Sequence, residues 1–103
     1  MNNERIYITI NHLEDFNAEY SFKPGDLVTI RKDHSNCYDD EAIAAYDRNN
    51  CKVGYVANSV CTVARGTYSS GRVYDTFDEE TRCTVRFIAE GFMICEVMEF
   101  IHR

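Results

Sequence analysis

The sequence has few of the residues that typify disordered or fibrous chains: its 103 residues include a single proline and only five glycines. No apolar run approaches the roughly 18 residues of a membrane span. The start, Met1 to Arg5, lacks the basic and then apolar layout of a secretion signal. With 45% hydrophobic residues, the chain has enough apolar material for one core. We expect a single domain over residues 1–103, without a membrane segment, in the cytoplasm.

Motifs for metal or nucleophilic chemistry are also missing. The five cysteines are odd in number and never form a Cys-x-x-Cys pair with a matching partner pair, so no zinc site is expected. Cys83 and Cys95 lie in alternating apolar segments, where a reduced cysteine acts as a small buried hydrophobe. The histidines are too scattered to define a dyad, and no glycine-rich phosphate loop occurs. We therefore expect no metal, no cofactor and no enzymatic activity.

Acidic residues are absent from one long stretch. The net charge of −6 is the wrong sign for a chain that coats nucleic acid by bulk electrostatics. Between Arg48 and Tyr74, however, there is no Asp or Glu, and this stretch carries Arg48, Lys52, Arg65 and Arg72. One interpretation is a local site for a polyanion. The other is a chance gap between acidic patches.

Alternating apolar residues predict six short strands. Ile6, Ile8 and Ile10 share one face of the first, and Gly54 in the fourth indicates that something approaches the backbone closely. Asn58 and Ser59 are suited to cap a short helix over residues 60–65, and residues 67–80 form a looser stretch. The strands are expected over residues 5–10, 27–32, 42–46, 51–56, 81–89 and 92–101.

The last two strands are joined by Glu90-Gly91, the strongest hairpin signal in the chain. In this hairpin Cys83, Val85 and Phe87 are expected to share the buried face. A small domain of six strands favours a mostly β fold, either a strongly bent sheet or a partly closed barrel.

Three ordered segments resemble the HIRAN domain family. They are the run from Lys23 to Ile30, the loop Asn36-Cys37-Tyr38-Asp39 that leads to Ala42-Ile43, and the strand Val53-Gly54-Tyr55. The resemblance is strongest over residues 6–77 and is followed by the hairpin 81–101. Further matches up to Asp75 look like the small stand-alone bacterial members. The resemblance implies an OB-like β-barrel with one or two short helices.

The resemblance also implies a function. In eukaryotic helicase-like remodellers the family's domain captures the 3′-hydroxyl end of single-stranded DNA, and ATP hydrolysis and zinc binding belong to other domains. Carried over, Tyr38 would stack on or flank the terminal base, and Asp39 would accept a hydrogen bond from the 3′-hydroxyl. Tyr55 stands where those versions have a histidine, and Asn58 where they have a phosphate-binding lysine. Binding of single-stranded DNA or a DNA 3′ end, in repair or processing of damaged DNA, is thus expected.

The residues themselves suggest further phosphate contacts and also plainer roles. Arg65 and Arg72 are candidate phosphate ligands, and Asn58 with Ser59 could donate from the start of the expected helix. In the alternative, Asp39 caps a turn and Tyr38 packs over the barrel end. Asn36 is expected to fix the backbone of its loop rather than to bind a ligand.

The first loop departs from the family pattern. The fork-remodelling versions have a basic and aromatic cluster there, whereas residues 12–20 are acidic and place their aromatic side chains at Phe16 and Tyr20. Carboxylates in this loop would repel phosphate. The alternative function is therefore a protein-interaction or regulatory module that kept the fold but lost DNA binding. A positive strip that joins Tyr38, Tyr55 and Arg65 to Arg72 would favour DNA.

Overall fold

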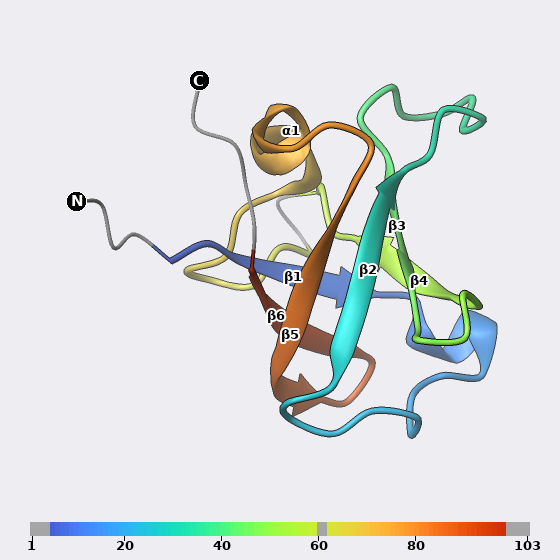
Figure 1. Ribbon diagram of the computed structural model, residues 1–103, viewed down its shortest axis with the longest axis vertical. Coiled ribbons are helices and arrows are strands. Elements are labelled where there is room, and N and C mark those ends of the chain that lie inside the picture. The colour runs from blue at the N-terminus through green and yellow to red at the C-terminus, as the bar shows by residue number, and fades with distance from the viewer. Residues whose placement is uncertain (1–4, 60–61, 99–103) are drawn as a thin grey trace.

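The computed structural model, which describes residues 5–59 and 62–98, is a closed barrel of six antiparallel strands (Figure 1). The strand order around the barrel is β1-β4-β3-β2-β5-β6, with β6 paired to β1. This confirms the mostly β class and shows that the barrel closes fully. The strands are β1 (Tyr7–Asn11), β2 (Leu27–Lys32), β3 (Ile43–Tyr46), β4 (Lys52–Val56), β5 (Glu80–Ala89) and β6 (Phe92–Val97).

Alternation along the strands fills the barrel with apolar side chains. Ile8 and Ile10 of β1 are fully buried, as the spacing of the three isoleucines predicts, and Ile6 before them is buried too. Ile30 of β2 and Met93 of β6 complete the centre of the same core. Closure gives each strand two neighbours, so the barrel carries no exposed sheet edge along these strands.

The helices do not lie where the sequence predicts them. The short helix α1 spans Ser70–Val73 and is capped by Ser69, and 3₁₀ turns lie at η1 (Leu13–Phe16) and η2 (Tyr74–Thr76). Of the expected helix, residues 60 and 61 lie outside the described residues, and Thr62 to Arg65 form turns, so the prediction is wrong there. The reason is a competing partner: the Ala64 amide donates to the Thr9 hydroxyl of β1 at 3.1 Å instead of to a helical carbonyl.

A β-bulge changes the inward face of β5. The register against β6 shifts between Val85 and Phe87, so one extra residue enters the strand and the alternation reverses. Cys83 and Val85 are buried as expected, but Phe87 is 57% exposed and Ile88 packs against the core instead. The prediction that Phe87 points inward is therefore wrong.

We expect Phe87→Ala to change the free energy of unfolding by less than about 1 kcal/mol, because most of the side chain already lies in solvent. Phe→Ala in a core costs about 3–5 kcal/mol, which is what simple alternation would predict. Urea denaturation of the variant measures the difference. Met93→Ala, a fully buried control on β6, should cost about 2–5 kcal/mol. A loss from Phe87→Ala as large as that from Met93→Ala would contradict the bulge.

Candidate nucleic-acid interface

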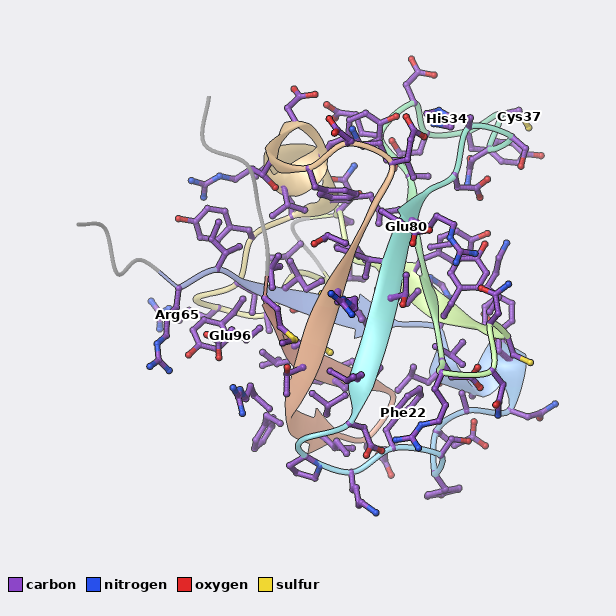
Figure 2. The ribbon with its side chains drawn as sticks, viewed as in Figure 1. Phe22, His34, Cys37, Arg65, Glu80 and Glu96 are labelled. Atoms are coloured by element: carbon purple, nitrogen blue, oxygen red, sulfur yellow. The ribbon has the colours of Figure 1, made fainter. Side chains whose placement is uncertain are left out.

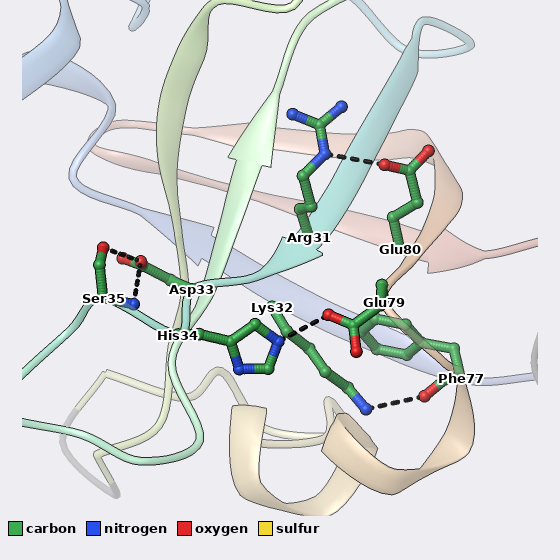
Figure 3. A network of polar contacts seen from close by, with 8 residues as sticks. All are labelled: Arg31, Lys32, Asp33, His34, Ser35, Phe77, Glu79 and Glu80. Carbon is green, nitrogen blue, oxygen red and sulfur yellow. Dashed lines mark hydrogen bonds and ion pairs between the residues drawn. The ribbon is translucent and has the colours of Figure 1, made fainter.

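The loop between β2 and β3, residues 33–42, has a rigid root (Figure 3). Consecutive residues at the end of β2 reach the segment that leads into β5. Arg31 Nε donates to Glu80 Oε1 at 2.8 Å, and Lys32 Nζ donates to the Phe77 carbonyl at 2.9 Å. Two residues further on, His34 Nε2 lies 2.6 Å from Glu79 Oε1. These contacts anchor the start of the loop that carries Tyr38 and Asp39 to the barrel.

Asp33 connects this root to β4. Its carboxylate accepts hydrogen bonds from the Ser35 hydroxyl at 2.8 Å and from the Tyr55 hydroxyl at 3.3 Å. The Ser35 hydrogen bond is the main cause that lowers the pKa of Asp33, with the Lys52 charge and Tyr55 adding to it. Lys52 Nζ in turn donates to the Tyr55 hydroxyl at 3.1 Å. These bonds hold the Tyr55 ring in one position.

Asn36 organises the tip of the loop. Its Oδ1 accepts the backbone N–H groups of Tyr38 at 2.8 Å and Asp39 at 3.0 Å, which confirms that Asn36 fixes the loop backbone. Asp39 also caps a turn, since its Oδ1 accepts the Glu41 amide at 2.9 Å. Tyr38 does not pack over the barrel end, because 95% of it is exposed. The loop therefore presents a bare aromatic ring next to a fixed carboxylate.

Asn58, just after β4, ties this loop to α1. Its Nδ2 donates to Asp39 Oδ2 at 3.1 Å, and its Oδ1 accepts the Gly71 amide at 2.9 Å. Nearby, the Ser70 hydroxyl donates to the Glu41 carbonyl. The side-chain amide of Asn58 is thus used within the protein, and the described residues that follow it, Ser59 and Thr62 to Arg65, are not helical. Its position fixes the orientation of Asp39.

A hollow of about 320 Å³, here called the end hollow, opens where these elements meet. Asp39, Tyr55 and Asn58 line it, three of the six residues that the sequence singles out. Phe16 of η1 lies behind Tyr55, with ring centroids 6.2 Å apart. Further lining groups, which the sequence did not point to, are Asn11, His12 and Thr62. The described lining also includes the apolar residues Ala42, Ile43, Val56 and Ala57, and it contains no lysine or arginine.

A second hollow of about 340 Å³, here called the arginine hollow, adjoins the first through Asn58. Arg65 and Arg72 line it, and none of its described lining residues is Asp or Glu. The Arg72 guanidinium lies over the Tyr68 ring, 4.3 Å from its centroid. Figure 2 shows Arg65 on the opposite side of the view from Cys37, the neighbour of Tyr38. The candidates thus form a line across the molecule rather than one cluster.

The four basic residues of the acid-free stretch lie at three separate places in the structure. Arg65 and Arg72 lie together, whereas Lys52 is held by Tyr55, and Arg48 lines a separate hollow with Lys23 and Asp26. The positive charge is therefore concentrated at one end of the line and does not form a continuous strip. Gly54 is close to another segment, as predicted, but that segment is the backbone at Asn11 and not a ligand.

Comparison with known proteins identifies the family. A model of the HIRAN domain matches residues 7–90, most of the chain. The chain therefore belongs to the HIRAN family, whose members are nucleic-acid-binding domains, and a general DNA-binding role fits it. Neither the curated proteins nor the solved structures gave a match.

Two features are absent from residues 5–59 and 62–98. No helix in these ranges has the length and apolar character needed to cross a membrane. Within the same ranges, no three His, Cys, Asp or Glu side chains are gathered as metal ligands.

Proposed function

We propose that this HIRAN domain captures single-stranded DNA at its 3′ end, by binding without chemistry, during repair or processing of damaged DNA in the cytoplasm. The observation that carries the proposal is the line from Tyr38 and Asp39, through Asn58, to Arg65 and Arg72. The two ends of this line differ in chemistry. One end offers an acceptor and an aromatic ring, and the other offers cations.

The chemical difference between the two ends of this line fits a DNA strand that binds in one direction only. A terminal 3′-hydroxyl needs an acceptor, and Asp39 keeps lone pairs beyond its bonds to Asn58 and Glu41. A terminal phosphate in the same place would meet a fixed carboxylate and be repelled. Phosphates further along the strand would lie over the arginine hollow, where Arg65 and Arg72 are exposed. The 3′ end would thus enter the end hollow and the strand would leave toward Arg65.

Tyr38 supplies the remaining contact. Its ring is exposed and stands on a loop tip that Asn36 holds in shape, so stacking a base on it requires little ordering of the protein. Stacking of one base on an aromatic side chain contributes about 1–3 kcal/mol. Any of the bases can stack in this way, so the contact suits recognition of a strand end rather than of a particular base.

Fluorescence anisotropy with short single-stranded oligonucleotides tests the proposal. We expect a 3′-hydroxyl oligonucleotide to bind more tightly than one with a 3′-phosphate, by roughly tenfold for one charge-assisted hydrogen bond. Asp39→Asn keeps an acceptor for the Glu41 amide but removes the charge, and should abolish this preference. Asp40→Asn, the same change at the exposed neighbour, is the matched control and should retain it.

The salt dependence of DNA affinity, measured with and without substitution of Arg65 or Arg72, tests the other end of the line. Two neutralised phosphates give a slope of about −1.4 in a plot of log affinity against log salt on a single strand. Removing either Arg65 or Arg72 by substitution with Gln should reduce that slope by about 0.7. Equal affinity for 3′-hydroxyl and 3′-phosphate ends would contradict end capture, and no binding at low salt would contradict DNA binding.

A further inference from the structure

Glu96 of β6 holds two arginines on the outer face of the barrel. Its Oε1 accepts a hydrogen bond from Arg86 Nε of β5 at 3.0 Å, and its Oε2 lies 3.9 Å from the Nε of Arg5, which precedes β1. We call Arg5 and Arg86 the arginine pair. Neither residue lines the end hollow or the arginine hollow, so the pair lies outside the line described above.

The arginine pair leaves an excess of positive charge at the surface. Only 17% of the Glu96 side chain is exposed, whereas 68% of the Arg5 side chain and 51% of the Arg86 side chain are exposed. The carboxylate is thus largely covered, and the two guanidinium groups face solvent. Because one carboxylate balances only one of the two guanidinium groups, a net charge of +1 remains.

Glu96 also fixes the orientation of both arginines. It engages the Nε atom of each guanidinium, so terminal N–H groups of both remain to donate to an anion. Arg5 also forms a hydrogen bond with the Tyr7 side chain, and this bond, together with the Glu96 charge, raises the pKa of Arg5. Side chains that are already held in place lose less freedom when they bind a ligand.

Backbone contacts connect the arginine pair to the arginine hollow. Tyr68, whose ring lies under the Arg72 guanidinium, donates its backbone N–H to the Tyr7 carbonyl at 2.7 Å. Tyr7 of β1 is in turn the register partner of Glu96 in β6. Figure 2 accordingly shows Arg65 and Glu96 on the same side of the view. A DNA strand that leaves the end hollow over Arg65 and Arg72 would therefore reach the arginine pair next.

We propose that the arginine pair binds a backbone phosphate of the same single strand, on the 5′ side of the captured end. This proposal rests on the proposed function, because the captured 3′ end sets the direction in which the strand runs. A guanidinium donates to phosphate oxygens in pairs, and a phosphate contact carries no sequence information. OB-fold domains contact about 4–16 nucleotides of a single strand, so a path that continues beyond the two hollows is within their range.

Fluorescence anisotropy with 3′-hydroxyl oligonucleotides of two lengths tests this site on the full chain. A strand of about 4 nucleotides should occupy only the two hollows, and one of about 12 can continue to the arginine pair. The net charge of the pair neutralises about one phosphate. The plot of log affinity against log salt should therefore be steeper by about 0.7 for the longer strand, which should bind about fivefold more tightly at about 0.1 M salt.

Substitution of either arginine should remove this gain. Arg5→Gln and Arg86→Gln each leave one guanidinium balanced by Glu96, so the longer strand should then show the slope and affinity of the shorter strand. Arg48→Gln removes the same charge from a separate hollow and is the matched control, which should keep the gain. Exposed ion pairs contribute little to stability, so the variants should fold, and circular dichroism measures this.

A chemically altered strand shows whether phosphate is the group that binds. Neutral methylphosphonate linkages in the 5′ half of the longer strand keep its length and bases but remove the charge there. With the unaltered domain, this strand should bind no more tightly than the shorter one.

Three results would overturn the assignment: equal binding of the two lengths, an undiminished gain in both folded arginine variants, or a gain that survives methylphosphonate substitution. In each case a retained preference for the 3′-hydroxyl over the 3′-phosphate end would leave end capture standing. The converse result is a gain that depends on both arginines while the two kinds of 3′ end bind equally. It would support the arginine pair and contradict end capture.

Discussion

Iodoacetamide should label Cys37 and Cys51 in the folded protein far faster than it labels Cys83 and Cys95. The first two thiols are exposed, whereas the other two are fully buried within the barrel. Burial raises the pKa of Cys95 from 9.0 to about 12. Burial also raises the pKa of Cys83 well above its ordinary value, and the neighbouring Cys95 adds to this shift. The thiolate is the reactive species, so both changes slow alkylation.

The size of the effect follows from the pKa. A rise of about three units lowers the thiolate fraction of Cys95 about a thousandfold at any pH below the ordinary pKa, before occlusion by the barrel is added. Mass spectrometry of proteolytic peptides after timed labelling gives the rate for each cysteine separately. In denaturant the four rates should become similar. Rapid labelling of Cys95 in the folded protein would show that the barrel interior opens readily.

Gly54→Val should destabilise the domain by about 3 kcal/mol, although valine is the better strand residue. A Cβ at this position would overlap the carbonyl oxygen of Asn11 and lie 3.0 Å from Ile10 Cγ2. Both belong to β1, which pairs with β4 here, and a backbone oxygen cannot rotate away as a side chain can. The strand must shift, and packing across the barrel is lost with it. Denaturant unfolding measures the change.

A second glycine provides the control. Gly66 has a positive φ of 88° but nothing within 4 Å of its position for a Cβ. Gly66→Ala therefore tests backbone strain alone and should cost about 1–2 kcal/mol. If Gly54→Val were neutral or stabilising, the close approach of β1 and β4 would be wrong, and strand propensity alone would govern the position.

Local sequence patterns predicted the strands because a half-buried strand alternates between buried and exposed residues, and this alternation shows between neighbours two residues apart. The alternation alone predicts that the isoleucines at 6, 8 and 10 are buried together, and β2 has the expected bounds. The β5 bulge could not be predicted, since it depends on the register against β6 and leaves no mark at Phe87 itself. The helix was misplaced because Asn58 and Ser69 are both suitable caps, and only packing against the barrel selects Ser69.

The candidate site was predictable in its residues but not in its arrangement. The HIRAN resemblance and the charge pattern pointed to Asp39, Tyr55, Asn58, Arg65 and Arg72, which line two adjoining hollows. No local signal indicates that Asn58 bonds to Asp39 and to Gly71, because these contacts cross 19 and 13 residues of chain.

The closing strand of the barrel constrains the order in which the chain can fold. β1 pairs with β4 and with β6, so its partners include Val56 and Glu96, while Tyr7 lies near the start of the described chain. Contacts this far apart in sequence are formed late and slowly, because a long loop must be closed before they add stability. During synthesis β1 therefore emerges first, yet it gains its second partner only when β6 is available. Until that moment at least one edge of this apolar strand stays open, and it depends on the speed of translation and on chaperones to avoid pairing with other chains.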